Sequence, residues 1–354
     1  EGVVYRNIRD ILANPVNQRH IREEYPDPRI HRRNTGYALD LLLNSGPFSP
    51  GAPAFNFRTL LAGSEGTLAF TTEVKLGLVP LPPRVKGLLC VHFEKLQDAF
   101  RGNLTALEHQ PVAIELMDKT VLELTKNNIE QRQNRFFVEG EPEAILIVEF
   151  VAGTEDEVRS SALALEQEMR RKGQGYHFPL IMGKDIPKVW KLRKAGLGVL
   201  SNMAGDAKPV AVIEDTAVHP ELLPDYLADF QQLLDKHELK CVYYAHIATG
   251  ELHLRPVLNL KDPAHVELFY TIALETARLV KKYRGSLSGE HGDGRLRGQF
   301  IPLMLGETVY GLLRNVKNTW DPAGIFNAGK ITDTPPMHSS LVRTSGCCAS
   351  EAYR

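Results

Sequence analysis

The chain has 354 residues, enough for two domains that each bury a sizeable apolar core. Hydrophobic residues make up 43% and charged residues 24% of it, an ordinary balance that excludes a disordered or fibrous protein. The 42 basic residues nearly balance the 43 acidic ones, which excludes a global field favouring nucleic acid or an anionic membrane, and the apolar runs are too short for a membrane helix.

The first part of the chain contains few core-forming patterns. Residues 1–33 are charged and interrupted by prolines, which predicts a connecting segment with one short helix near 4–12. Residues 44–53 are rich in Gly, Pro and Ser, as in an exposed loop. Residues 67–79 alternate apolar and small residues and predict paired strands, which end at the prolines of 80–83. We expect the first domain boundary there.

Strands and helices then alternate. Thr154, followed by three acidic residues, has the pattern of a helix N-cap. After Pro263 the pattern is helical as far as Tyr283, and after Thr332 it is lost, which predicts a loose tail. The chain therefore predicts an α+β domain on one sheet, mainly antiparallel. Its expected strands are 85–93, 111–118, 144–152, 208–218 and 240–247, and its expected helices are 96–109, 154–172, 222–236, 263–283 and one before Asp321.

The cysteines and the first residues bear on the context of the chain. Cys90, Cys241, Cys347 and Cys348 do not have the spacing of a zinc or iron–sulfur motif, which favours a reducing, cytoplasmic setting. The first residues include neither an initiator Met nor an apolar leader, so we expect the sequence to start inside a longer protein.

Four side chains could form a metal site. His246 and His253 flank a Thr249–Gly250 turn between two strand-like runs, so a hairpin would bring both imidazoles to one side. Glu290 and His291 lie in a loop with glycines on both sides. Two imidazoles and a carboxylate suit zinc or a similar ion that acts as a Lewis acid. The alternative that these are ordinary surface residues stays open.

Several cations could meet an anionic substrate. Arg193 lies on a helix beside Trp190, and a guanidinium suits a carboxylate, although a solvated helix charge is the alternative. Arg255 alternates with His253 on one face of a strand, and Lys208 could add a further cation or be an exposed loop lysine. A short glycine-rich turn could hold phosphate with its backbone N–H groups: Gly63, Ser64, Glu65, Gly66 and Thr67.

Segments 33–43, 60–76, 243–256, 285–294 and 321–331, taken together and in this order, resemble the FAD-linked oxidases of the vanillyl-alcohol oxidase type. Within that family the chain is similar to the D-lactate, glycolate and D-2-hydroxyglutarate dehydrogenase branch. It is most similar to the flavin part of large bacterial D-2-hydroxyglutarate dehydrogenases that carry an iron–sulfur module.

The resemblance implies a role for each matching residue. His246, His253 and Glu290 would bind a divalent metal, with Zn or Mn expected, and His291 would be the base. Arg193 would bind the substrate carboxylate, with Arg255 and Lys208 as further substrate-binding residues. The FAD would be lined by Gly63, Ser64, Glu65, Gly66, Thr67, Asn327 and Lys330.

The implied fold is the C-terminal part of an FAD-binding domain of this type plus an α/β cap domain with a mainly antiparallel sheet. We expect residues 1–83 to belong to the FAD-binding domain, 84–284 to form the substrate or cap domain, 285–336 to return to the flavin site, and 337–354 to be a loose tail.

The sequence departs from the family in three ways. Arg255 replaces a small amide, and this second cation favours a dianionic substrate such as a 2-hydroxydicarboxylate. The glycine-rich loop that grips the FAD pyrophosphate and the cysteine-rich iron–sulfur part are both missing from this chain, so an iron–sulfur cluster is expected only in a longer parent.

These features together predict FAD-dependent oxidation of a D-2-hydroxyacid, with D-2-hydroxyglutarate favoured. The alternatives are a D-lactate or glycolate dehydrogenase, a metal-dependent hydrolase, and an inactive fragment that does not hold FAD. The expected partners are a small 2-hydroxyacid and an electron acceptor or iron–sulfur module, without nucleic acid or an integral membrane segment. The expected location is cytoplasmic, peripheral to the membrane only through an electron acceptor.

Overall fold

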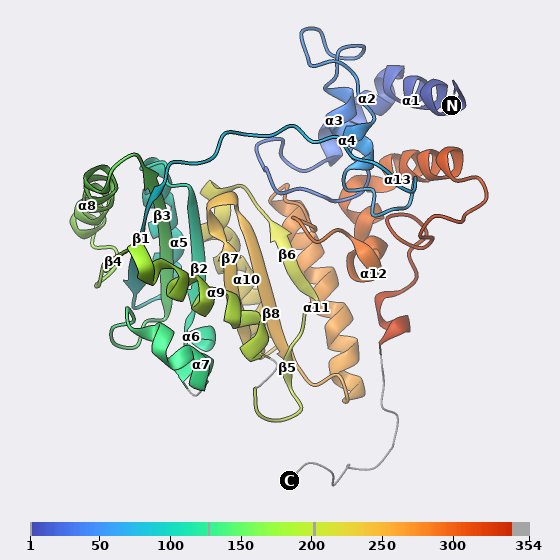
Figure 1. The fold of residues 1–354 in the computed structure, drawn as a ribbon. Helices are drawn as coiled ribbons and strands as arrows, with labels where there is room; N and C mark the ends of the chain where they lie inside the picture. The colour runs from blue at the N-terminus through green and yellow to red at the C-terminus, as the bar shows by residue number, and fades with distance from the viewer. Residues whose placement is uncertain (1, 127, 201–202, 342–354) are drawn as a thin grey trace.

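The computed structural model describes residues 2–126, 128–200 and 203–341 (Figure 1). The paired cysteines Cys347 and Cys348 lie outside the described residues. The strands are β1 (Val85–Phe93), β2 (Ala113–Asp118), β3 (Ala144–Ala152), β4 (Leu180–Met182), β5 (Lys208–Pro209), β6 (Ile213–Ala217), β7 (Cys241–His246) and β8 (Glu251–Leu258). The α-helices are α1 (Gly2–Ala13), α2 (Pro15–Glu24), α3 (Leu39–Leu43), α4 (Arg58–Leu61), α5 (Leu96–Glu108), α6 (Lys119–Lys126), α7 (Ile129–Arg132), α8 (Glu155–Arg171), α9 (Ile186–Leu200), α10 (Leu223–Lys236), α11 (Pro263–Lys282), α12 (Gly294–Arg297) and α13 (Ile301–Trp320).

One eight-stranded sheet organises the molecule. Its order is β4-β1-β3-β2-β7-β8-β5, with β6 also paired to β8, and the paired strands run antiparallel. This confirms the α+β class with a mainly antiparallel sheet. The hairpin expected between His246 and His253 is also present, because β7 pairs with β8 through a short turn in which Gly250 has a positive φ of 81°. The expected N-cap is present too, since Thr154 forms a capping box with Glu157 at the start of α8.

The sheet is covered on both faces, which explains why its central strand β3 is apolar along most of its length. On β3, Leu146 and Val148 pack into a core shared with α5, α8, α10 and α11. Ile145 and Ile147 point to the other face and pack against α6 and α9. Figure 1 shows α5, α10 and α11 behind the sheet and α9 in front of it. Side chains that alternate along a strand therefore belong to different cores.

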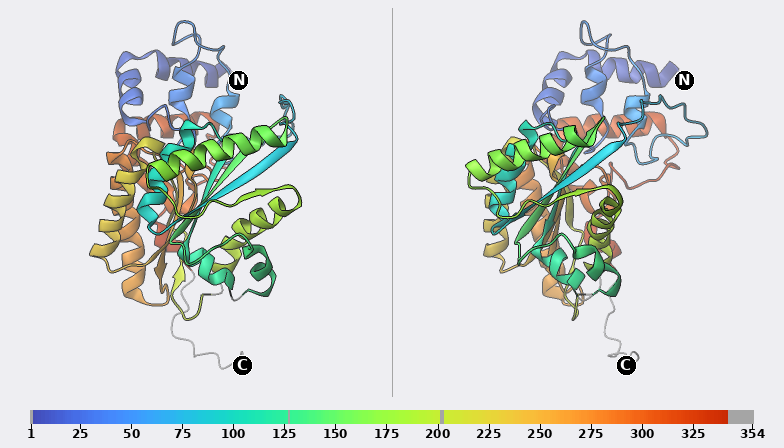
Figure 2. Two further views of the ribbon diagram at one scale, coloured as in Figure 1. Left: turned by 90° about the vertical axis from the view of Figure 1, so that its left-hand side faces the viewer. Right: turned by 60° about the vertical axis from the view of Figure 1, so that its left-hand side comes forward.

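The prediction for residues 1–33 was incomplete, because the segment forms two helices that belong to the core. Ile8 and Leu12 of α1 and Ile21 of α2 are buried, and both helices contact α13. Figures 1 and 2 show α1, α2 and α13 together at one end of the molecule, beyond the sheet. Pro15, one of the prolines that interrupt the apolar pattern, stands at the first position of α2, directly after the N-cap Asn14, where a proline is well accommodated.

The prediction of paired strands over residues 67–79 was wrong. Residues 69–83 form no regular element, and their apolar side chains are exposed, with Phe70 at 79%, Leu76 at 76% and Leu78 at 95%. Alternation predicts a strand only where another strand offers its edge, and no strand of the described residues pairs with this segment.

The segment after Thr332 is more ordered than the predicted loose tail as far as the structure describes it. Met337–Ser340 form a short 3-10 helix, and Met337 is buried. Residues 342–354 lie outside the described residues. Among the helices that the structure describes, none is both long enough and apolar enough to cross a bilayer.

Candidate active site

Three histidines and a glutamate from distant parts of the chain converge on one face of the sheet. His246 ends β7, His253 lies on β8, and Glu290 and His291 follow in the loop before α12. One ligand atom from each of His246, His253 and Glu290 can be chosen so that all lie within 4.8 Å of one another. The Nε2 of His246 is 3.4 Å and the Nε2 of His291 is 3.7 Å from Oε1 of Glu290. These groups therefore share one small volume.

The Nδ1 atom of each imidazole is engaged by a protein acceptor. Nδ1 of His246 is 2.7 Å from the Glu115 carboxylate, and Nδ1 of His291 is 2.9 Å from the Glu214 carboxylate. Nδ1 of His253 is 2.8 Å from the backbone oxygen of Glu214. An acceptor at Nδ1 selects the tautomer that carries its proton there and leaves the Nε2 lone pair available. The Nε2 lone pairs of His246 and His253 and the Glu290 carboxylate are a donor set that fits a divalent cation, and the Nε2 of His291 stays available to accept a proton.

Burial and charge act differently on these groups. The hydrogen bond with Glu115 raises the pKa of His246, whereas burial lowers the pKa of His253. Glu251, between the two histidines on the hairpin, is fully buried, and its carboxylate oxygens accept no hydrogen bond from the residues that the structure describes. Burial, and next the negative charge of Glu290, raise the pKa of Glu251 to about 8. Arg32 brings a positive charge to both carboxylates, because it forms an ion pair with Glu290 and its Nε lies 3.5 Å from Oε2 of Glu251. The site therefore combines carboxylates with arginines that pair with them.

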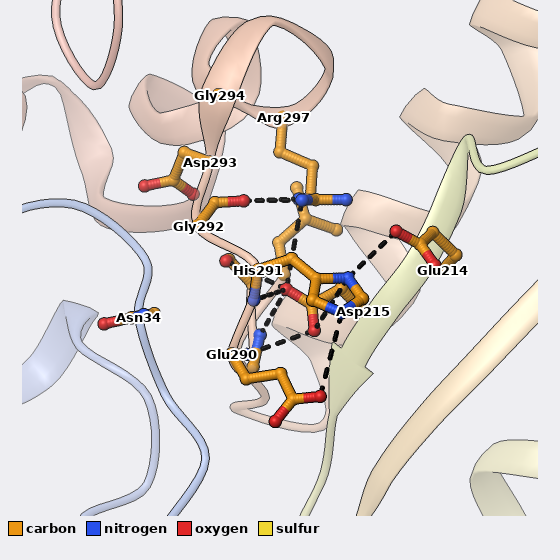
Figure 3. A network of polar contacts seen from close by, with 12 residues as sticks. Asn34, Glu214, Asp215, Glu290, His291, Gly292, Asp293, Gly294 and Arg297 are labelled. Atoms are coloured by element: carbon orange, nitrogen blue, oxygen red, sulfur yellow. Dashed lines mark hydrogen bonds and ion pairs between the residues drawn. The ribbon is translucent and has the colours of Figure 1, made fainter. Parts of the chain in front are cut away.

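A buried carboxylate fixes the loop that carries Glu290 and His291. Asp215 accepts hydrogen bonds from the backbone N–H groups of Gly289, Glu290 and His291 at 3.0, 3.1 and 3.0 Å, and from the Ser288 hydroxyl at 3.1 Å. Figure 3 shows this carboxylate behind the loop, with His291 turned toward Glu214. A carboxylate can accept several hydrogen bonds at once, so a single side chain determines the course of the loop.

Two arginines lie beside the histidines, both close to one tyrosine ring. The guanidinium carbons of Arg193, from α9, and Arg255, from β8, are 5.2 and 5.8 Å from the ring centre of Tyr244. Arg193 pairs with Glu115 at 2.9 Å, and its buried Nε has no hydrogen-bond partner among the described residues. Arg255 pairs with Glu214 at 2.8 Å and donates its Nε–H to the Tyr244 hydroxyl.

Lys208, the third predicted substrate-binding cation, lies on β5 opposite Leu258, and its ammonium group donates a hydrogen bond to the backbone oxygen of Met203. That contact joins it to the loop before the strand.

The predicted cofactor-binding turn meets the active-site loop. The Glu65 carboxylate accepts from the backbone N–H groups of Asp293 and Gly294 at 2.5 and 3.0 Å, and the Asn327 side chain donates to the Glu65 backbone oxygen at 2.7 Å. Space is open at Gly66, where an added Cβ would contact nothing within 4 Å. Ser64 and Thr67 are buried, and the Thr67 hydroxyl bonds to Tyr37 at 2.6 Å.

Lys330 and Gly63 complete the predicted cofactor set, with different surroundings. The Nζ of Lys330 lies 3.4 Å from the backbone oxygen of Ala328, a local contact that involves neither the turn at 63–67 nor the loop of Glu290 and His291. Gly63 packs against the Asn34 side chain, and its φ of 83° favours glycine.

Sequence reasoning missed four acidic residues of this site, one of which is Glu251 at the start of β8. Glu115, Glu214 and Asp215 lie inside strands β2 and β6, and Asp215 is fully buried. The available signal was an acid in the middle of an apolar strand, as in the run around Glu115, because a charge is rarely placed in a sheet covered on both faces unless it has a partner.

The chain is similar to known proteins over most of its length. The family described as FAD linked oxidases, C-terminal domain, matches residues 82–331. The chain is similar to D-2-hydroxyglutarate dehydrogenase of Pseudomonas putida, with 34% identity over 337 residues, which are 93% of this chain and 32% of that protein. It is also similar to glycolate oxidase subunit GlcD of Bacillus subtilis, with 22% identity covering 82% of this chain and 60% of that protein. The chain thus spans about a third of the length of the first relative.

A solved structure shows the same fold at low sequence identity. The crystal structure of p-cresol methylhydroxylase with substrate bound aligns with a TM-score of 0.54 at 14% identity, covering 81% of this chain and 60% of that one.

Proposed function

Because this chain belongs to the FAD-linked oxidase family, as its C-terminal domain, we propose that it forms the substrate-binding part of an FAD-dependent D-2-hydroxyacid dehydrogenase. The proposed substrate is D-2-hydroxyglutarate, the compound in the name of the relatives that are 34% identical. The observation that carries the proposal is the convergence of His246, His253, Glu290 and His291 beside two arginines.

The arginines would bind the substrate by its carboxylates. Arg193 has a buried Nε without a partner, so a carboxylate placed there would satisfy a donor that otherwise costs free energy. Arg255 also lies close to Tyr244 and would receive the distal carboxylate of a dianion. Holding both ends of a five-carbon acid restricts its orientation, which is a large contribution to catalysis.

His291 would accept the proton of the 2-hydroxyl at its Nε2. The Glu214 carboxylate beside its Nδ1 fixes the tautomer and would stabilise the imidazolium that forms. When bound, a flavin supplies the hydride acceptor, and a divalent cation on His246, His253 and Glu290 supplies Lewis acidity at the hydroxyl oxygen. The turn at 63–67, which meets the active-site loop through Glu65, fits one side of the flavin cradle.

One experiment tests the catalytic assignment. The parent protein, which is the unsubstituted chain or a longer protein that contains it, is loaded with FAD and Mn²⁺. D-2-hydroxyglutarate is then added without oxygen while the visible flavin band is followed. We expect bleaching by the parent protein and none by His291→Asn, with equal flavin content. His237→Asn, which changes an imidazole at the surface of α10, is the matched control. Equal bleaching by parent and His291→Asn would refute the assignment of His291.

A second candidate, a D-lactate or glycolate dehydrogenase, is favoured by one observation. Arg255 already has partners in Glu214 and Tyr244, so it needs no second substrate carboxylate to satisfy its donors. Comparing the bleaching rates with D-lactate, glycolate and D-2-hydroxyglutarate distinguishes the two, because Arg255→Met should slow only the dicarboxylate reaction if Arg255 binds its distal end.

A further inference from the structure

We propose that Glu115 and Glu214 are positioning residues, each of which holds one imidazole and one arginine of the candidate site. This inference rests on the proposed function, since it assigns the support of the same site. It goes further by stating that Glu115 couples a cation ligand, His246, to Arg193, and that Glu214 couples the proposed base, His291, to Arg255.

Glu115 uses one oxygen for each partner. Its Oε1 is 2.7 Å from Nδ1 of His246, and its Oε2 is 2.9 Å from a terminal nitrogen of Arg193. Only 13% of the Glu115 side chain and 12% of the Arg193 side chain are exposed, so water screens these contacts weakly. The carboxylate lies on β2, next to β7, which carries His246. Its place is therefore set by the sheet.

Glu214 repeats this arrangement on the other side of the site. Its Oε1 is 2.9 Å from Nδ1 of His291, and its Oε2 is 2.8 Å from a terminal nitrogen of Arg255. Its side chain is 11% exposed. Two separate strands thus present the same unit, an imidazole, a carboxylate and a guanidinium. A single such unit could be an ordinary ion pair, but two of them around one cluster of imidazoles indicate a common role in positioning that cluster.

The chemistry of this unit requires a carboxylate. Both oxygens accept hydrogen bonds, one from an arginine N–H and one from the N–H at Nδ1 of the imidazole, which leaves the Nε2 lone pair free. A glutamine offers one acceptor and one donor. If its oxygen keeps the arginine, its NH₂ faces Nδ1 and favours the tautomer with the proton at Nε2. An Nε2 that carries a proton can neither bind a cation nor accept a proton from substrate.

The surface of the molecule supplies a matched control. Glu275 on α11 also joins an imidazole to a cation, at 2.8 Å from Nε2 of His237 and 2.6 Å from Lys236. It has the same chemistry, but its imidazole belongs to α10, outside the candidate site. Glu275→Gln therefore shows what the loss of a bridging carboxylate does when no site depends on it.

The first measurement is the affinity for Mn²⁺. The 354-residue chain is stripped with a chelator and titrated with Mn²⁺, and free Mn²⁺ is counted from its electron paramagnetic resonance signal. Because loss of an outer partner of a metal-binding histidine costs about 10–100-fold in metal affinity, Glu115→Gln should weaken binding by that factor. Glu214→Gln and Glu275→Gln should stay within roughly twofold of the parent, as expected for sites that do not share the ligands. Glu115→Asp, which keeps the charge, should recover part of the loss.

The second measurement reads the tautomers directly. Long-range ¹H–¹⁵N correlation spectra of histidine-labelled protein, at a pH where the rings are neutral, distinguish a proton on Nδ1 from one on Nε2. We expect Glu115→Gln to change the His246 signals and Glu214→Gln to change the His291 signals, each without changing the other. A purely structural role would shift the melting temperature but would not move one imidazole at a time.

The outcomes separate this inference from the proposed function. If the parent binds Mn²⁺ and Glu115→Gln binds it equally well, with unchanged His246 signals, the inference is overturned and the proposed function stands. If the parent binds no Mn²⁺, the metal part of the proposed function fails. The tautomer spectra then still decide the inference, since unmoved signals overturn it and selectively moved signals support it.

Discussion

The candidate site has two parts that are held in place by different means. The strand-borne part, with Glu115, His246 and His253, is fixed by the antiparallel ladder of β2, β7 and β8. The loop-borne part, with Glu290 and His291, belongs to no ladder and is fixed by a carboxylate that accepts its backbone N–H groups. The comparison shows that one buried carboxylate, Asp215, can order a loop as a partner strand orders a strand. A strand has many ladder hydrogen bonds, however, whereas the loop depends on this one side chain.

The largest expected effect therefore follows from breaking the support of the loop. Asp215→Ala removes the acceptor of the Ser288 hydroxyl and of the part-buried N–H groups of Glu290 and His291, while the N–H of Gly289 keeps the Asp215 backbone oxygen; each lost acceptor costs about 1–3 kcal/mol, so we expect a loss of about 3 kcal/mol in the free energy of unfolding. Urea denaturation measures it. Asp262→Ala, which removes an N-cap from α11, is the control with an expected loss of about 1 kcal/mol. Equal losses in the two variants would contradict the special role of Asp215.

The second prediction concerns the sheet, whose stability we expect to fall at acidic pH. His92 on β1 is fully buried, and this burial lowers its pKa to about 4. Between its ordinary value of about 6.5 and 4, the unfolded imidazole binds a proton that the folded one excludes, so stability falls as the pH falls, by about 3 kcal/mol over that range.

Denaturation at a series of pH values checks this prediction. His92→Gln should remove that part of the slope, because glutamine does not titrate. The same substitution at the exposed His31 is the control. If the parent and His92→Gln have the same slope below pH 6.5, burial of a neutral imidazole is not a source of acid sensitivity in this sheet.

The same contrast explains what could be predicted from the sequence. The strand-borne part was predictable, because alternation placed His253 and Arg255 on one face and the Thr249–Gly250 turn indicated the hairpin. The loop-borne part was only partly predictable. Glycines on both sides of Glu290 suggested a loop near a ligand, but its support by Asp215 joins residues more than seventy positions apart.

The errors have physical causes of the same kind. The apolar alternation in 67–79 is a genuine strand pattern without a strand beside it in the described residues. Glu115 and Glu214 were missed because alternation cannot tell a solvent-facing acid from one that faces a second core. Local patterns therefore predict elements well, whereas the partners that complete a site depend on which elements become neighbours.

A smaller effect is expected at the junction of the loop with the turn at 63–67. Glu65→Gln removes the charge that strengthens two hydrogen bonds, from Asp293 and Gly294, and should cost about 1 kcal/mol. Hydrogen exchange should become faster at the amides of Asp293 and Gly294 and stay slow at His291, whose amide Asp215 still holds. Uniformly faster exchange along the loop would show that the two carboxylates do not act separately. Glu73→Gln, on the exposed segment, is the control.

The smallest effect on stability is expected at Lys330, where a small change would separate a role in cofactor binding from a role in folding. Its ammonium group makes one long contact with the Ala328 backbone oxygen, so Lys330→Ala should change the free energy of unfolding by less than about 0.5 kcal/mol, as at most surface positions. Asn327→Ala should cost more, because Asn327 holds the backbone of Glu65. A side chain that contributes little to the fold is free to serve a ligand. If Lys330 lines the FAD, flavin retention during gel filtration should fall in Lys330→Ala while its melting temperature stays unchanged; equal retention would remove Lys330 from the cofactor-binding set.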